Sequence, residues 1–283
     1  MAQDKLQEVI LKIDSAYKKM QSIKEISLSS IEKYMDEFSI SASFNSNAIE
    51  GNTFTYDETR LLIKEGVTSN KRSFREHEEI IGYKTGFDFL LESKEKNRII
   101  DENFIKELHS LVLRGHLEAG SFRKIQVYIG DMFNVTFTPC SASEVPKKIL
   151  EYSKQVQEDL LHFTCNKDSN FDWLKLFHTL SKHHIEFERI HPFIDGNGRT
   201  GRLLLIYEML MLGLLPIDIR LEERSKYNSA FKKYDRKLER SDNPNSKTQS
   251  MAQLLAESEL RSMEAWNKMF LEFVADIEEC QRL

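Results

Sequence analysis

One stretch, HPFIDGNGRTGR at residues His191–Arg202, decides how this chain folds and what chemistry it carries. Pro192 ends the helix expected before it, and a nearly all-apolar helix is expected after it. Gly196 and Gly198 allow positive φ angles and close backbone approach. Successive N–H groups in such a loop, together with the N-terminus of the next helix, favour an anion. The stretch therefore predicts a phosphate site built without a P-loop lysine.

The charged side chains of this stretch are those that a transfer reaction needs. Arg199 and Arg202 share a helix face, and two guanidinium groups suit a di- or triphosphate. Asp195 offers one hard oxygen ligand, which is how Mg²⁺ is usually held beside phosphate oxygens. His191 stands at the loop entrance, where an imidazole can take a proton from an attacking hydroxyl. The set predicts metal-assisted phosphoryl or nucleotidyl transfer, and the alternative is a purely structural helix start.

The same stretch matches the signature of the Fic family, HPFx[DE]GNGRxxR, at every fixed position. The order of elements from about residue 70 to about residue 240 also resembles that family. The resemblance implies a mainly α fold, with a Fic-type helical core, a small β-hairpin flap, N-terminal inhibitory helices and a C-terminal helix. It also implies a protein adenylyltransferase, which transfers AMP from ATP to a Ser, Thr or Tyr hydroxyl of a target protein with the help of Mg²⁺.

The resemblance carries particular roles onto this sequence. It implies that His191 is the catalytic base and that Asp195 is the Mg²⁺ ligand. A flap would hold an extended target segment by strand-type backbone pairing, and the flap residues would be Val127, Tyr128 and Ile129. Nucleotide binding would fall to Gly196, Asn197, Gly198, Arg199 and Arg202.

A second, shorter motif lies far upstream. Residues Ser46–Gly51 read SNAIEG and fit the Fic family's inhibitory pattern [ST]xxxE[GN]. Ser46 and Glu50 are one helical turn apart and share a face. The Glu50 carboxylate would pair with Arg202 in place of the γ-phosphate, and a misplacement of about 1 Å costs on the order of a hundredfold in rate. The expected inhibitory residues are therefore Ser46, Glu50 and Gly51, although so short a motif alone is more often a solvated helix end.

Other side chains have two interpretations each. Tyr227 would either line an adenine pocket by stacking or pack in the core. Arg123 would either contact nucleotide phosphates or form a structural ion pair. His184 and Glu188 share a helix face, but His184 also lies on an apolar stripe, which favours a packed histidine over a metal ligand. The last helix carries an apolar stripe that would be core or a dimer face, made of Met263, Trp266, Phe270, Phe273 and Ile277.

Hydrophobic periodicity outlines the remaining elements. Helices are expected at about residues 3–24, 29–38, 56–66, 71–93, 101–113 and 199–212, with a further helix running into His191. A hairpin is expected at about residues 124–138, centred on Gly130-Asp131. The segment Ser241–Ser250, SDNPNSKTQS, would separate a last helix from the rest. We expect an N-terminal region with the inhibitory motif (1–70), a catalytic core (71–240) and a C-terminal helix (241–283).

Composition limits the classes of function. A net charge of −5 gives no basic excess for nucleic acid, and no segment reads as a signal peptide or a membrane span. Three cysteines far apart make no disulfide framework, so a cytoplasmic setting is expected. The expected partners are ATP, an unidentified target protein, the chain itself as a substrate and a second copy in a homodimer, with neither nucleic acid nor membrane. AMP removal, transfer of another phosphate-containing group and a non-enzymatic nucleotide-binding regulator are the alternative functions.

Overall fold

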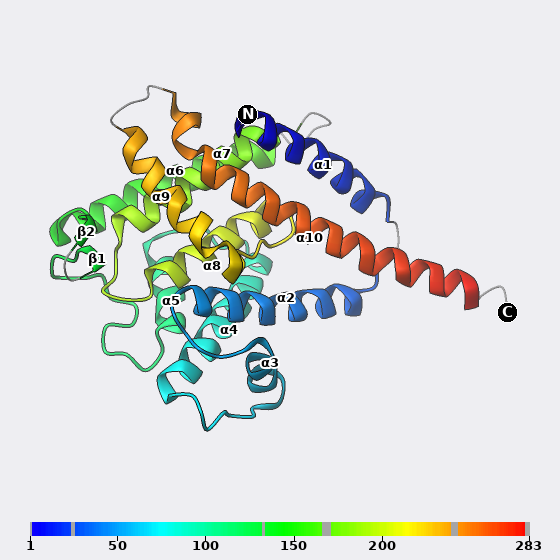
Figure 1. The fold of residues 1–283 in the computed structure, drawn as a ribbon, viewed down its shortest axis with the longest axis horizontal. Coiled ribbons are helices and arrows are strands. Elements are labelled where there is room, and N and C mark those ends of the chain that lie inside the picture. Colours follow the sequence, from blue (N-terminus) through cyan, green and yellow to red (C-terminus); the bar gives the residue numbers. More distant parts are fainter. Residues whose placement is uncertain (1, 24–25, 132–133, 166–170, 239–242, 281–283) are drawn as a thin grey trace.

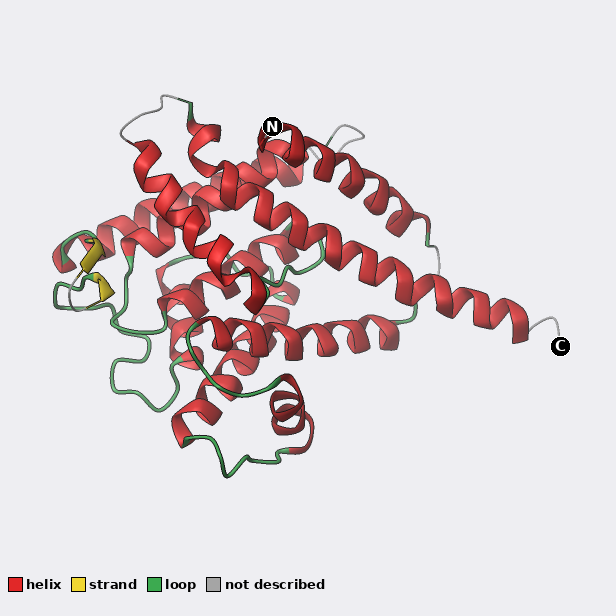
Figure 2. Ribbon diagram, viewed as in Figure 1, coloured by secondary structure: helices red, strands yellow, loops and turns green. Residues whose placement is uncertain are grey.

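The computed structural model describes residues 2–23, 26–131, 134–165, 171–238 and 243–280. These residues form a mainly helical structure with a small two-stranded sheet at one edge (Figures 1 and 2), as expected. Among them, no helix combines the length and the apolar character needed to cross a membrane. In chain order the elements are α1 (Ala2–Ser22), α2 (Leu28–Ile49), α3 (Tyr56–Glu65), α4 (Phe74–Glu95), α5 (Glu102–Val112), β1 (Ile129–Asp131), β2 (Asn134–Phe137), α6 (Val145–Cys165), α7 (Trp173–Ile190), α8 (Asn197–Met211), α9 (Arg224–Leu238) and α10 (Pro244–Cys280).

Helix α8 lies at the centre of the molecule because it is apolar on nearly every side. All residues from Leu203 to Leu210 are buried, as is typical of a helix without a polar face. The one charged residue among them, Glu208, accepts a hydrogen bond at 2.6 Å from Nδ1 of His183. Helices α2, α4, α5 and α7 pack around α8 (Figure 1). The burial of α8 therefore fixes the position of the loop that precedes it.

Helices α1 and α10 pack along each other on one side of the molecule (Figure 1). Helix α10 also contacts α7 and α9. Of its apolar stripe, Met263, Trp266 and Phe270 are buried in the core, whereas the side chains of Phe273 and Ile277 lie outside the described residues. The separator expected at Ser241–Ser250 is wrong in its second half, because α10 already begins at Pro244. Proline suits the first position of a helix, where its missing N–H has no intrahelical partner.

Polar residues set the ends of α3 and α4. Thr55 and Glu58 form the capping box predicted for α3, and Ser73 and Glu76 form another at α4. Gly66 ends α3 in the left-handed region, with φ 68°. These local signals are independent of tertiary packing, which is why the sequence predicts them well.

Helix α2 is longer than predicted, because it continues to Ile49 instead of ending near Phe38. Serine and asparagine in SASFNSNAI lower the intrinsic helix propensity. In the structure this half of α2 is mostly buried, and its polar side chains bond to the preceding turn. Ser43 Oγ donates to the Ser39 carbonyl at 2.7 Å, and Asn47 Nδ2 donates to the Ser43 carbonyl at 2.8 Å. Packing against α3, α4 and α8 thus overrides the local preference.

The hairpin is shorter than predicted and its turn is shifted. Strands β1 and β2 are antiparallel, with Gly130 opposite Val135 and Asp131 opposite Asn134. The turn expected at Gly130-Asp131 is therefore wrong, since both residues lie in β1. Of the three expected flap residues, Ile129 lies in β1, whereas Val127 and Tyr128 precede it. Gly130-Asp131 resembles a two-residue turn in sequence, but in the structure both residues pair with β2, and a register irregularity lies between Ile129 and Gly130.

Candidate active site

The loop between α7 and α8 begins at His191, whose backbone is left-handed. Its φ is 50°, and its N–H donates to the Phe187 carbonyl at 3.0 Å. Such a conformation costs a non-glycine residue about 1–3 kcal/mol and persists where the surroundings hold it. Arg123 provides this support, because its Nε donates to the His191 carbonyl at 2.8 Å and its N–H to the Pro192 carbonyl at 2.9 Å. Contacts from outside the loop therefore hold the His191 backbone in this conformation.

Arg123 is buried at the base of the hairpin segment and binds backbone carbonyls. Its guanidinium donates to the carbonyls of His191, Ile125 and Cys140. Within the described part of the chain, these hydrogen-bond partners are backbone carbonyls. The sequence had instead suggested either contact with nucleotide phosphates or an ion pair with a carboxylate. Arg123 ties both ends of the hairpin segment to the His191 loop.

The His191 imidazole is neutral near neutral pH, because burial lowers its pKa to about 4. Its Nδ1 lies 3.3 Å from the Glu188 carbonyl. A carbonyl only accepts hydrogen bonds, so Nδ1 carries the proton and Nε2 keeps its lone pair. The ring can therefore accept a proton at Nε2.

The next part of the loop presents backbone N–H groups at the start of α8. Gly196 has φ 76° and is the N-cap of the helix. Asn197 closes the loop, because its Oδ1 accepts from the Phe193 N–H and its Nδ2 donates to the Phe193 carbonyl, both at 2.9 Å. The Asn197 side chain is thus used inside the loop, and its contribution to anion binding would come from the backbone. The positive end of the α8 dipole lies at Gly198.

His109 on α5 supports this loop, a role that sequence reasoning missed. Its Nδ1 accepts from the Gly120 N–H at 2.9 Å, so Nε2 carries the proton and donates to the Asp195 carbonyl at 3.0 Å. The ring also stacks on Phe193, with centroids 3.6 Å apart. Burial lowers the pKa of His109 to about 4, which keeps the ring neutral. No local pattern signals this contact, because His109 and Asp195 are 86 positions apart in sequence.

Asp195 is held between two arginines. Its Oδ1 accepts from the Gly196 N–H at 2.6 Å and lies 3.3 Å from Arg199 Nη2. Its Oδ2 lies 3.0 Å from Nη2 of Arg75, a residue of α4 that the sequence did not single out. Burial works against the charge of Asp195, but Arg199 and the Gly196 N–H hold its pKa below the ordinary value. The carboxylate is therefore ionised at neutral pH.

The carboxylate that this loop offers to a metal ion is that of Asp195. Across the residues that the structure describes, no group of three or more His, Cys, Asp or Glu side chains is placed to hold a metal. This disfavours the site considered around His184 and Glu188. An ionised Asp195 fits Mg²⁺ that takes its remaining ligands from phosphate oxygens and water.

Arg202 is buried and joins α8 to the end of α2. Its Nε donates to Ser46 Oγ at 2.8 Å, and its Nη2 donates to the Ser46 carbonyl at 3.0 Å and to Glu50 Oε1 at 2.8 Å. Burial opposes the charge of Arg202, but Glu50 raises its pKa, so the side chain is a cation. Its Nη1 has no hydrogen-bond partner among the described residues. A phosphate oxygen would satisfy this donor, which is costly to leave unpaired.

Glu50 caps the C-terminus of α2, and its carboxylate lies over the start of α8. Gly51 follows with φ 100°, which lets the chain turn away from the helix. A Cβ atom added to Gly198 would collide with the Glu50 carboxylate and would lie 3.1 Å from Arg202 Nη1. The structure thus brings the upstream motif and the loop motif into direct contact.

The two motifs border a cavity of about 700 Å³. His191 and Arg202 line it, together with Glu188, whose pKa is raised to about 7 by burial. Tyr227 of α9 lines it too, with its ring centroid 5.8 Å from Arg202 Cζ and its hydroxyl 2.7 Å from His184 Nε2. Tyr227 therefore lines the cavity and also packs in the core. His184 is a buried histidine of the core. The hairpin borders the same cavity through Ile129, Gly130 and Thr136.

Other expected site residues lie away from this wall. Val127 and Tyr128 do not line the cavity, and Tyr128 is exposed. Arg199 is buried, with Nη1 at 3.3 Å from Oε1 of Glu79 on α4. Asp195 and Arg199 thus form one group with side chains of α4, beside the cavity that His191 and Arg202 line.

Comparison with known proteins gives a consistent result. Residues 99–209 match the Fic/DOC family. Protein adenylyltransferase fic-1 of Caenorhabditis elegans is 35% identical over 202 residues, covering 66% of this chain and 35% of that protein. Protein adenylyltransferase Fic of Nematostella vectensis is 32% identical over 227 residues, covering 78% of this chain and 49% of that protein. The chain spans less than half the length of each of these relatives.

Solved structures share the fold. A Fic domain-containing signaling protein from Bacteroides thetaiotaomicron has a TM-score of 0.79 and 25% identity, covering 92% of this chain and 97% of that one. Residues 134–508 of C. elegans Fic-1 give a TM-score of 0.70 at 23% identity, covering 95% of this chain and 74% of that one.

Proposed function

This chain contains a Fic/DOC-family domain, and we propose that it is a protein adenylyltransferase that moves AMP from ATP to a Ser, Thr or Tyr hydroxyl of a protein. The observation that carries the proposal is the environment of Arg202. Its Nη1 is a buried donor without a partner among the described residues, beside Gly198 and in a cavity that His191 also lines. A phosphate chain along the N-terminus of α8 would satisfy this donor and would lie within reach of a general base.

In the proposed reaction, the target hydroxyl oxygen attacks the α-phosphorus of ATP. A bond forms between these two atoms, the bond from the α-phosphorus to the bridging oxygen breaks, and pyrophosphate leaves. His191 Nε2 takes the hydroxyl proton. Asp195 would hold Mg²⁺, which would neutralise phosphate charge. The phosphates would be bound by the backbone of Gly196, Asn197 and Gly198 and by the guanidinium groups of Arg199 and Arg202.

The remaining walls of the cavity would bind the other parts of the substrates. Tyr227 would support the adenine from α9. The hairpin, with Ile129 at the cavity and Val127 and Tyr128 before it, would pair with an extended segment of the target. This pairing uses backbone groups and therefore tolerates many target sequences.

We further propose that Glu50 inhibits the enzyme. Its carboxylate lies beside Gly198 and pairs with Arg202, at the position that a terminal phosphate would take. ATP would bind only after this carboxylate moves, or would bind with its α-phosphate out of line. Ser46 supports the contact, because its hydroxyl and its carbonyl both accept from Arg202.

The division of the chain belongs to the same proposal. Residues 1–70 would regulate, residues 71–240 would catalyse, and residues 241–283 would pack on the core through helix α10. The contacts of α10 with α7 and α9 support the last assignment. A cytoplasmic location, self-modification and a homodimer complete the proposal.

Intact-mass measurement after incubation with ATP and Mg²⁺ tests the proposed activity. We expect one adenylyl unit to be added to a protein substrate or to the chain itself by Glu50→Gly, and none by Glu50→Gly combined with His191→Ala. A different added mass would identify another transferred group. Absence of any added mass with Glu50→Gly, across a panel of cell proteins, would reject adenylyl transfer.

A further inference from the structure

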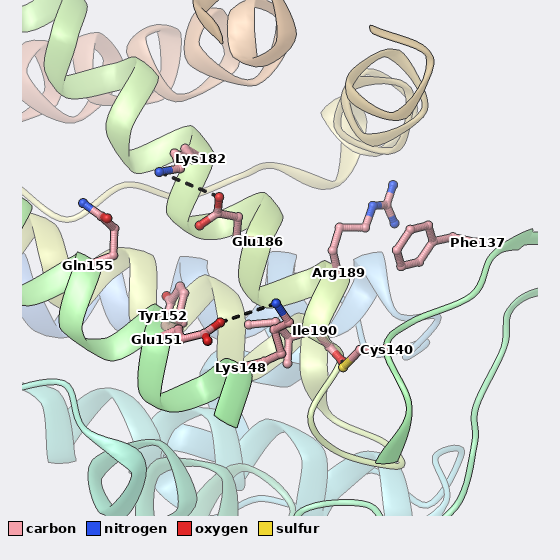
Figure 3. Close-up of a pocket in the computed structure, with 10 residues that line it drawn as sticks. All are labelled: Phe137, Cys140, Lys148, Glu151, Tyr152, Gln155, Lys182, Glu186, Arg189 and Ile190. Carbon is pink, nitrogen blue, oxygen red and sulfur yellow. Dashed lines mark hydrogen bonds and ion pairs between the residues drawn. The ribbon is translucent and has the colours of Figure 1, made fainter. Parts of the chain in front are cut away.

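A second cavity, of about 490 Å³, lies between α6, α7 and the end of β2 (Figure 3). Its inner part is apolar or weakly polar and is formed by Cys140, Tyr152 and Ile190, with the Phe137 ring at one side. Tyr152 and Ile190 are buried at its base, whereas Phe137 and Cys140 are partly exposed and supply the open apolar surface. This volume lies within the range of about 300–1,000 Å³ that is usual for ligand pockets.

The charged residues at the rim of this cavity are paired with one another. Lys148 lies 3.4 Å from Glu151, and Lys182 lies 3.8 Å from Glu186, as the dashed lines in Figure 3 mark. Because the rim charges already have partners, the apolar interior is the surface that an occupant would cover.

Arg189 separates this cavity from the candidate active site, and it lines both. Its guanidinium lies over the Phe137 ring, 4.2 Å from the centroid (Figure 3), and 5.3 Å from the Phe231 centroid. Its Nε also donates to Asp235 at 2.9 Å. Arg189 is therefore a fixed partition between two adjoining cavities.

Strand β2 reaches both cavities through successive residues. Thr136 lines the candidate active site, whereas Phe137 lines the second cavity. Ile129, the register partner of Phe137, also lines the candidate active site, so the hairpin runs past both cavities. A target segment paired with the hairpin would place its hydroxyl in the first cavity and bring a nearby residue to the second.

We propose that the second cavity is a subsite for one large apolar side chain of the target, such as Leu, Met or Phe. This residue lies within a few positions of the modified hydroxyl. The inference rests on the proposed adenylyl transfer and deepens it, because backbone pairing alone gives the hairpin no sequence preference. Extended segments would all pair equally well with the flap through their backbones. The cavity would favour those segments whose apolar side chain fills it.

A peptide library tests the subsite. Each peptide carries a single Thr as its acceptor, and each of the five positions on either side of it is varied among Ala, Gln, Glu, Lys, Leu, Met and Phe. The Glu50→Gly enzyme with labelled ATP and Mg²⁺ is expected to modify peptides with Leu, Met or Phe at one offset about tenfold more efficiently than those with Ala there. The preference is expected in KM for the peptide and not in KM for ATP.

A matched pair of variants places this preference in the cavity. Glu151 is exposed at the rim, and Glu158 is exposed farther along the same helix, outside the lining. Glu151→Trp, which fills the opening, is expected to remove the advantage of the apolar peptide over the Ala peptide. Glu158→Trp is expected to keep the full advantage.

The outcomes separate the subsite from the activity on which it rests. Peptides modified without an apolar preference, or with a preference that Glu151→Trp leaves intact, would overturn the subsite while adenylyl transfer stands. Transfer to folded proteins but to no peptide would also overturn it, because an extended segment would then not be what the cavity holds. No transfer to any substrate would reject the proposed function itself.

Discussion

The Arg202 guanidinium donates from Nη2 to Glu50 Oε1 at 2.8 Å, and the two residues lie 152 positions apart in sequence. The Arg202 side chain is 5% exposed, whereas the Glu50 side chain is 42% exposed. The cation is thus part of the core, and the carboxylate reaches it from an open side. A ligand that offers Arg202 a more strongly charged oxygen can replace Glu50 without disturbing the helix that holds Arg202.

Replacing Glu50 by Gln tests whether its charge inhibits. The amide keeps the size of the side chain but loses the charge that pairs with Arg202. We expect adenylyl transfer to rise with Glu50→Gln and to rise further, on the order of a hundredfold over wild type, with Glu50→Gly. Labelled-ATP incorporation at fixed enzyme concentration measures both rates.

Glu37→Gln is the control for this change. Glu37 lies on the same helix and pairs with Arg60 at the surface. Surface pairs contribute little, so this variant is expected to behave as wild type. Equal incorporation by wild type and Glu50→Gly would remove the argument for inhibition.

The protonation of His191 predicts the pH profile of transfer. A base with a pKa of about 4 is already neutral at pH 6, so kcat/KM of Glu50→Gly should be flat from about pH 6 to 8 and fall only below about pH 5. Glu188 borders the same cavity and has its pKa raised to about 7, so its titration could be mistaken for that of His191. The profile is therefore measured both with Glu188 present and with Glu188→Gln. A half-maximum near pH 6.5 in both proteins would show that His191 titrates as an unperturbed imidazole.

Sequence reasoning works for this chain where the signal is local. The capping box of Thr55 and Glu58, the break at Pro192 and the glycines of the loop each act through neighbouring residues. The loop signature and the upstream motif also predict that Glu50 meets Arg202, because the family resemblance supplies the long-range contact. The spacing of Glu50 and Arg202 in the sequence would not by itself have predicted this contact.

Several features that the sequence did not predict depend on tertiary contacts. Helix α2 passes through a serine- and asparagine-rich stretch because that stretch is buried. Arg123 and His109 both bind backbone carbonyl groups on distant segments. A sequence pattern does not indicate which carbonyl a side chain will reach. The same holds for Arg75, which reaches Asp195 from α4.

His109 is expected to act on nucleotide binding without touching the nucleotide. His109→Ala would leave the Asp195 carbonyl and the Gly120 N–H without their buried partner and would remove the stack on Phe193. We expect a loss of about 2–4 kcal/mol in the free energy of unfolding. Titration calorimetry with ATP and Mg²⁺, at a temperature where the variant is folded, should show weaker binding because the Asp195 loop is no longer fixed.

His109→Asn separates positioning from stability. The Asn side chain can restore the acceptor for the Gly120 N–H but cannot reach the Asp195 carbonyl as the imidazole does. It should recover part of the stability and little of the nucleotide affinity. If both variants bind ATP as wild type does, His109 is a packing residue only.

Histidines whose pKa is lowered by burial predict a loss of stability in mild acid. Burial lowers the pKa to about 4 for His109, about 3 for His184 and about 4 for His191. Below the unfolded value of about 6.5, the unfolded chain binds protons that the folded chain does not, so the free energy of unfolding falls as pH falls. The loss should reach about 2 kcal/mol per group near pH 4.5, and urea unfolding at several pH values measures it.

His183 acts in the opposite direction and limits the stability on the alkaline side. Burial opposes its charge, but Glu208 and Asp159 raise its pKa to about 9. Its contribution is complete below pH of about 6.5 and is lost as pH rises to about 9, so stability should be greatest near pH 6.5. His184→Gln removes one acid-side titration and should flatten the slope below that maximum, whereas Gln at the exposed His116 should not. An unchanged slope with His184→Gln would show that the acid sensitivity arises from other groups.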